Sequence, residues 1–126
     1  FLVKHLRIHW QEGERYFRDC LLDFNEANNI AGWQWVAGCG ADAAPYFRIF
    51  NPILQGERFD PLGEYVKKWI PELSKVPKKF IHKPWELNEK IKDFELGKTY
   101  PKPMVIHEEA RNAALAAFQK IKKKII

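Results

Sequence analysis

The sequence predicts an all-α protein built as a helical bundle, and three observations carry this prediction. Apolar residues recur at intervals of three and four along most of the chain, which is the spacing of one face of an α-helix. At two places a residue that favours a helix N-cap stands directly before a proline. No stretch alternates apolar and polar residues for long enough to indicate a β-strand.

The amino-terminal third is expected to hold two helical regions. Apolar residues at helical spacing predict two helices, or one bent helix, over residues 1–22. Residues 23–26 interrupt this pattern with side chains that favour turns and caps. An apolar, tryptophan-containing helix is expected over residues 27–37, and the Gly-Cys-Gly sequence of residues 38–40 ends it.

Two helix starts are marked by an N-cap residue followed by proline. Asn51 precedes Pro52 and Asp60 precedes Pro61, and proline lacks only an N–H group that the first turn leaves unpaired anyway. A helix of roughly 8 to 10 residues is expected after each pair. The second of these helices is expected to stop at Pro71.

The carboxyl-terminal part is expected to be less regular until its last helix. Residues 74–84 are rich in proline and lysine and predict a linker, and a short helix is expected over residues 84–94. Residues 100–103 are expected to be extended. Residues 108–124 predict a final helix with an alanine-rich side, and the lysines near its end suit the helix dipole.

Length and composition limit the class of protein. The chain has 126 residues, 46% of them hydrophobic, so we expect a single domain over residues 1–126. No apolar run approaches the roughly 20 residues that cross a bilayer, so no membrane partner is expected. The start at Phe1, without Met or a leader, is expected to be a cut through a longer chain. Cys20 and Cys39 form no disulfide framework, so a reducing cytoplasmic compartment is expected.

The net charge of +5 is unevenly distributed along the sequence. Residues 75–126 hold 13 Lys/Arg and 6 Asp/Glu, a balance of +7, while residues 1–74 hold 8 and 10, a balance of −2. A basic surface of this kind attracts polyanions, although solubility is the commoner reason for a lysine-rich face.

Other residue patterns carry little functional signal. His5 and His9 have the i, i+4 spacing of two metal ligands, but no third ligand or Glu base accompanies them, so no metal site is predicted. Residues 107–109, His-Glu-Glu, are expected to cap a helix electrostatically rather than to catalyse. Ser74 beside the linker offers no hydrolytic triad, and residues 38–40 do not form a phosphate-binding glycine loop.

Four ordered motifs between Trp10 and Leu73 are much more specific. They are WQEGERYF over residues 10–17, NIAGWQW over 29–35, DAAPYFRIFNP over 42–52, and QGERFDP over 55–61 followed by WIPEL over 69–73. The chain thereby resembles the photolyase and cryptochrome family, and most closely the bacterial enzymes that repair cyclobutane pyrimidine dimers. The similarity covers essentially the whole chain and is weaker after residue 75.

The resemblance implies the carboxyl-terminal portion of a helical FAD-binding domain, in which residues 75–126 are a less certain extension. It implies a deoxyribodipyrimidine photo-lyase, a carbon-carbon lyase in which reduced FAD donates an electron to a pyrimidine dimer in DNA after absorbing light. It also implies a monomeric full enzyme with an antenna chromophore in an amino-terminal domain absent from this sequence.

The resemblance assigns five residues to the flavin and its electron supply. Trp33 is similar to the relay tryptophan nearest the flavin, and Trp10 to the next one outward. Asn29 matches the position whose amide faces the redox-active nitrogen of the central ring. Asp23 and Asn25 match positions that contact the flavin.

Two of these positions depart from the family pattern. Asn25 stands where the family usually has Asp, and an uncharged acceptor can still bond the cofactor. His9 replaces a frequent Asp directly before the relay tryptophan, and this change is expected to weaken a helix cap by about 1 kcal/mol.

The resemblance also assigns residues to the damaged DNA. Trp35 is similar to the aromatic wall against which the extrahelical dimer packs. Arg48, Gln55 and Arg58 fall where related enzymes approach the damaged strand and its phosphates. Burial in the core remains the alternative for Trp35, and ordinary surface ion pairs remain the alternative for the two arginines.

Two other functions remain open from the sequence. One is a cryptochrome-like blue-light photoreceptor, although the amide at Asn29 is typical of photolyases. The other is an inactive, truncated helical module. The isolated piece is expected to be inactive and to bind FAD weakly or not at all.

Overall fold

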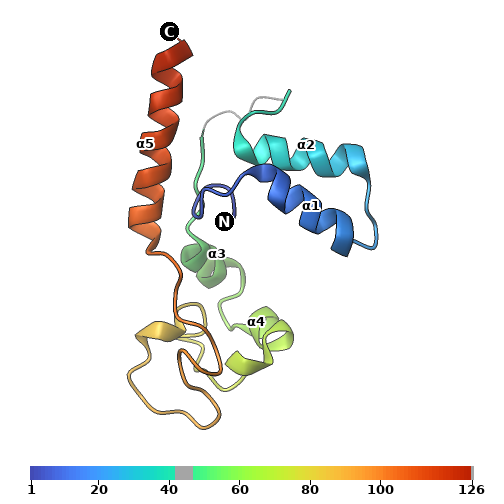
Figure 1. Cartoon of the computed structure of the whole chain (residues 1–126). Helices are drawn as coiled ribbons and strands as arrows, with labels where there is room; N and C mark the ends of the chain where they lie inside the picture. Colours follow the sequence, from blue (N-terminus) through green and yellow to red (C-terminus); the bar gives the residue numbers. More distant parts are fainter. Residues whose placement is uncertain (42–46, 126) are drawn as a thin grey trace. The chain divides into compact units, whose positions relative to one another are not determined.

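The computed structural model describes residues 1–41 and 47–125 (Figure 1). The chain forms two compact units: the first unit is Phe1–Ile49 with Val105–Ile126, and the second unit is Phe50–Met104. The regular structure of the described residues is helical, with two isolated bridges, Ile91 with Phe94 and Leu96 with Tyr100. The all-α prediction is therefore confirmed, while the single domain stays a prediction. Residues 42–46 of the third motif lie outside the described residues.

The first residues of the chain form turns, so the prediction of helix throughout residues 1–22 is wrong for residues 1–9. The backbone N–H groups of His5 and Leu6 both donate to the carbonyl oxygen of Phe1, at 3.0 and 3.1 Å. Arg7 has a φ of 55°, a left-handed conformation that a helix cannot accommodate. So short a segment does not offset the cost of helix nucleation, in spite of its apolar spacing.

Helices α1 (Trp10–Cys20) and α2 (Glu26–Ala37) form a helical hairpin in the first unit, in which the two helices lie side by side (Figure 1). The predicted turn over residues 23–26 separates them, and Asn25 Oδ1 accepts a hydrogen bond from the Asn28 N–H at 3.0 Å. Gly38 ends α2 with a φ of 79°, a conformation that glycine adopts without strain. His9 also serves as an N-cap, because its Nδ1 accepts from the Gln11 N–H at 3.3 Å.

Helix α5 (His107–Ile125) completes the first unit and confirms the predicted final helix. Ala114 is its most buried described residue. Phe118 stacks on Phe47 with ring centroids 4.4 Å apart and an angle of 2° between the ring planes. At the start of α5, His107 Nδ1 lies 2.9 Å from Nε2 of the buried His5. These contacts fix α5 to His5 in the amino-terminal turns and to Phe47.

The second unit begins with α3 (Pro52–Phe59), which starts where the Asn-Pro pair predicts. Asn51 Oδ1 accepts from the N–H groups of Ile53 and Leu54, at 3.0 and 3.3 Å. Helix α4 (Glu64–Trp69) starts later and is shorter than predicted. The Asp60 carboxylate still binds its first turn, at 3.2 Å from the N–H groups of Tyr65 and Val66.

The core of the second unit contains the segment that the sequence predicts to be a linker, so that prediction is wrong. Leu73, Val76 and Ile81 are each 1% exposed and pack together with partly buried residues that include Val66 and Ile70. A 3₁₀ turn, η1 (Pro71–Leu73), directs the chain into this cluster. Lysines and prolines between the three apolar residues stay outside, because burial of an unpaired lysine is costly.

The prediction of a helix over residues 84–94 is also wrong. Only the 3₁₀ turn η2 (Pro84–Glu86) forms there. Asp93 has a φ of 63°, and Ile91 bridges to Phe94, which together make a tight turn in place of helix. Tyr100 forms an isolated bridge with Leu96, residues 101–103 carry no helix or bridge, and the expected α5 follows them. In the part of the chain that the structure describes, no helix has the length and apolar character that a bilayer crossing requires.

Candidate functional site

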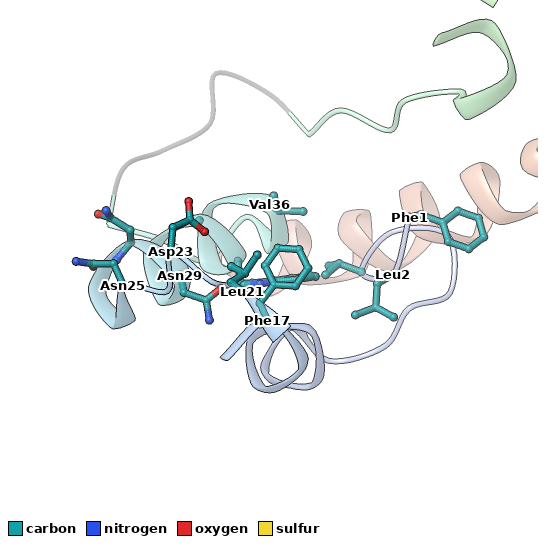
Figure 2. Close-up of a pocket in the computed structure, with 12 residues that line it drawn as sticks. Phe1, Leu2, Phe17, Leu21, Asp23, Asn25, Asn29 and Val36 are labelled. Atoms are coloured by element: carbon teal, nitrogen blue, oxygen red, sulfur yellow. The ribbon is translucent and has the colours of Figure 1, made fainter. Parts of the chain in front are cut away.

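A pocket of about 560 Å³ lies in the first unit, within the volume range of small-molecule sites. In the view of Figure 2, the polar side chains lie toward one end of the pocket, Phe1 and Leu2 toward the other, and apolar side chains between them. The pocket therefore suits a flat, largely apolar ring with a polar edge. It is lined by Phe1, Leu2, Val3, Phe17, Leu21, Asp23, Asn25, Asn28, Asn29, Gly32, Trp33 and Val36.

Asn29 is held in one orientation by α1. Its side chain is only 8% exposed, and Nδ2 donates to the backbone oxygen of Glu14 at 3.0 Å and to Glu14 Oε1 at 3.3 Å. Both partners are acceptors, so the NH₂ end of the amide must face α1. The carbonyl oxygen Oδ1 is consequently the group that Asn29 can offer to a molecule in the pocket.

Glu14 is itself fixed from a second side. Arg18, one turn later on α1, donates to Glu14 Oε1 from Nη2 at 2.6 Å and from Nε at 3.2 Å. This hydrogen bond and the charge of Glu14 raise the pKa of Arg18 above its ordinary value. The buried Glu14 Oε1 thus accepts from the Arg18 guanidinium and from the amide of Asn29 at once.

Trp33 packs directly on the backbone of α1. A Cβ atom added at Gly13 would lie 2.2 to 2.5 Å from Cη2, Cζ3 and Cζ2 of the indole, closer than atoms can approach. Phe17 meets the same ring edge-on, with centroids 5.1 Å apart. Gly13 therefore makes the space that places Trp33 at the wall of the pocket.

Trp10 is the first residue of α1 and lines a second pocket of about 330 Å³ in the first unit. It stands three residues before Gly13, or roughly 4.5 Å along the helix axis. Because Gly13 contacts the indole of Trp33, both tryptophans belong to the same end of the α1–α2 hairpin. Glu14 also lines the second pocket, so one residue connects the surroundings of both.

Comparison with known proteins identifies the family. Residues 1–120 match the family described as the FAD binding domain of DNA photolyase. The chain belongs to this family.

Relatives agree with that assignment. The chain is 58% identical over 126 residues to the deoxyribodipyrimidine photo-lyase of Agrobacterium fabrum, an alignment of 98% of this chain and 26% of the relative. A bacterial class III photolyase from Agrobacterium tumefaciens superposes with a TM-score of 0.85 at 57% identity, over 98% of this chain and 26% of that one. A Synechocystis cryptochrome gives 0.83 at 37% identity, over 92% and 24%. The chain thus spans about a quarter of their length, and both the resemblance and the fold class are confirmed.

The pocket of the first unit fits the isoalloxazine ring of FAD in chemical character. Its apolar walls suit the fused rings, and the carboxylate and amides at one end suit a heterocycle edge that carries donors and acceptors. Four residues that the sequence predicts at the flavin, Asp23, Asn25, Asn29 and Trp33, line this one pocket. Asn25 caps α2 through Oδ1, so its NH₂ group is the part left for a ligand.

The residues predicted to contact DNA lie elsewhere. Trp35 is 40% exposed and is not among the residues that line the pocket. It follows Trp33 by two positions on α2, which turns it roughly 200° around the helix axis. The backbone oxygen of Arg48 accepts a hydrogen bond from Lys4 Nζ. Gln55 and Arg58 belong to α3 of the second unit.

Sequence reasoning missed the two residues of α1 that position the predicted site. Gly13 and Glu14 are the two buried residues of α1. One signal was present, because a glycine in a helix interior costs about 1 kcal/mol relative to alanine and is usually retained for a close approach. Nothing comparable distinguished Glu14 from its neighbour Glu12 in the sequence.

Proposed function

We propose that this chain forms part of the flavin site of a deoxyribodipyrimidine photo-lyase, which repairs pyrimidine dimers in DNA with light. The observation that carries the proposal is the pocket in which Asn29, Asp23, Asn25 and Trp33 meet. The names of the relatives support the same activity. When bound, FAD supplies the light absorption and the electron for dimer cleavage.

The residues around the pocket would hold and supply that cofactor. Asn29 presents its carbonyl oxygen as an acceptor for a ring N–H group, and its orientation is preset by Glu14. Asp23 and Asn25 would bond the polar edge. Trp33 would give an electron to the flavin. Trp10 would then give an electron to the oxidised Trp33, because neighbouring indoles can be oxidised transiently.

The substrate in this proposal is a pyrimidine dimer turned out of the DNA helix. Trp35 offers an exposed aromatic face that can replace lost base stacking. Arg48, Gln55 and Arg58 would contact the damaged strand, since cationic and amide donors position a phosphate backbone. The complete enzyme is proposed to act as a monomer and to carry an antenna chromophore beyond this sequence.

We also propose that the enzyme works in the reducing cytoplasm. Cys20 and Cys39 are both free and exposed, and exposed thiols persist best where cellular reductants protect them.

A second candidate is a cryptochrome-like photoreceptor, which the similarity to the Synechocystis cryptochrome favours. Both candidates use the same pocket and the same flavin. They differ in whether illumination converts a dimer into two pyrimidines. A repair assay therefore separates them.

The test is a chimera in which this chain replaces the matching quarter of the Agrobacterium fabrum enzyme, a replacement that 58% identity makes practicable. The chimera is expected to purify with FAD and to remove pyrimidine dimers from DNA only under blue or near-ultraviolet light. Dimer loss is measured by chromatography of digested DNA, with a dark sample as control.

Two variants connect the result to the residues of this chain. In the chimera, Trp33→Phe is expected to slow photoreduction of the flavin strongly, whereas Trp85→Phe, in the second unit, is expected to leave it unchanged. A folded chimera that holds FAD but never repairs dimers would instead support the photoreceptor. A folded chimera without FAD would contradict the proposed flavin site.

A further inference from the structure

The carboxyl-terminal turns of α5 concentrate positive charge. From Ala110 to Ile125 the helix contains five basic residues and no Asp or Glu, and four of the five are Lys120, Lys122, Lys123 and Lys124. These four lysines occupy roughly 6 Å of helix axis. All four are exposed, and the ion pairs of the described residues involve none of them. We call them the α5 lysines.

The packing of α5 leaves the α5 lysines available. The helix is attached through His107, Ala114 and Phe118, which lie on one side of it. At 100° per residue, the α5 lysines are distributed around the remaining sides. Their charges therefore surround the helix end, and they form no ion pair with the described residues of the first unit.

We propose that the α5 lysines bind the DNA phosphate backbone, independently of sequence and of damage. Duplex DNA carries one negative charge per roughly 1.7 Å of its axis, so four flexible cations within one helix end can each reach a phosphate. This inference rests on the proposed function only in taking DNA as the partner. It adds an auxiliary contact outside the residues assigned to the dimer.

DNA fits the α5 lysines better than an anionic membrane does. A helix that lies in a bilayer surface needs a wide apolar face beside its cations. Between residues 119 and 124, Ile121 is the one large apolar side chain, and it is 58% exposed. Phe118 already stacks on Phe47. Over residues 119–124, four lysines therefore stand against one large apolar side chain, and charge outweighs apolar area.

The experiment compares two variants of the full 126-residue chain with equal charge. The test variant is K122Q/K123Q/K124Q, and glutamine preserves helix propensity. The control is K78Q/K90Q/K92Q, which replaces three exposed lysines of the second unit. Each variant lowers the net charge from +5 to +2. Binding to a short, labelled, undamaged duplex is followed by fluorescence anisotropy from about 50 to 200 mM KCl.

The parent chain is expected to bind the duplex with a steep salt dependence. The test variant should reduce the slope of log affinity against log salt by about 2 to 3, and the control by less than about 1. Equal effects of the two variants, or no duplex binding by the parent chain, would overturn the proposal. Binding to phosphatidylserine vesicles in preference to the duplex would overturn it as well. None of these readouts uses flavin or light, so they do not bear on the repair activity of the chimera.

Discussion

The side-chain amide of Asn29 donates to the backbone oxygen of Glu14 at 3.0 Å, and this bond joins α2 to α1. Glu14 Oε1 accepts a second bond from the same amide at 3.3 Å. Trp33, the proposed relay tryptophan, packs against the preceding residue of α1, Gly13. The orientation of the proposed flavin contacts is thus set from the opposite helix.

Replacement of Glu14 by Ala should lower the free energy of unfolding by about 1 kcal/mol, because a buried amide loses one of its hydrogen-bond partners. Urea titration followed by circular dichroism at neutral pH measures this change. Glu12→Ala is the matched control on α1, since the Glu12 carboxylate pairs with Arg15 at the exposed surface. It should stay within about 0.5 kcal/mol of the parent. Equal losses for both variants would mean that the Asn29 bond contributes nothing specific.

Replacement of Gly13 by Ala should destabilise the chain by about 1 to 3 kcal/mol, because the new methyl group overlaps the indole of Trp33. Helix propensity alone would predict a gain of about 1 kcal/mol. Gly32→Ala provides the comparison, since no described atom beyond its chain neighbours and the local helix backbone lies within 4 Å of the added Cβ, and α2 should gain stability there. Denaturation midpoints for the two variants should therefore move in opposite directions. A stabilised Gly13→Ala chain would show that Trp33 does not need this contact.

The elements that the sequence predicts well carry their own local signals. Helix α3 begins where the Asn51 side chain caps it, and Gly38 ends α2 in the left-handed conformation that glycine favours. Both signals act between residues a few positions apart, so no tertiary information is needed. The placement of Asn29 and Trp33 at one site follows from the family resemblance of the NIAGWQW motif over residues 29–35.

The parts that the sequence predicts poorly depend on long-range contacts. Val76 and Ile81 lie among lysines and prolines with no helical or alternating period, and they become core only by packing against Val66 and Ile70. The burial of Glu14 is equally hard to predict from the local sequence, because its partner Asn29 lies fifteen residues away. Local patterns cannot distinguish such residues from a solvated surface.

Replacement of Asp60 by Ala should destabilise the second unit by about 1 to 2 kcal/mol, because its carboxylate accepts from two N–H groups of the first turn of α4. Asp93→Asn is the control, since Asp93 makes an exposed ion pair with Lys75 and asparagine tolerates its positive φ. Hydrogen exchange at the amides of Tyr65 and Val66 reports the loss locally. Unchanged protection of these two amides in Asp60→Ala would contradict the capping role.

Acid should weaken the first unit through His5, which is 7% exposed and whose buried Nδ1 has no hydrogen-bond partner among residues 1–41 and 47–125. Burial lowers the pKa of His5, and electrostatic interaction with the Phe1 amino group and with His107 lowers it further. The unfolded chain therefore binds a proton more readily than the folded chain does. Stability from this group is complete above about pH 6.5 and is lost as the pH falls toward the folded pKa, with a slope of up to about 1.4 kcal/mol per pH unit.

Urea titrations from about pH 7.5 down to about pH 5 should show this loss of stability in the parent chain. His5→Gln should reduce it, whereas His9→Gln, at an exposed cap, should leave it intact. An unchanged decline in His5→Gln would assign the acid sensitivity to another group.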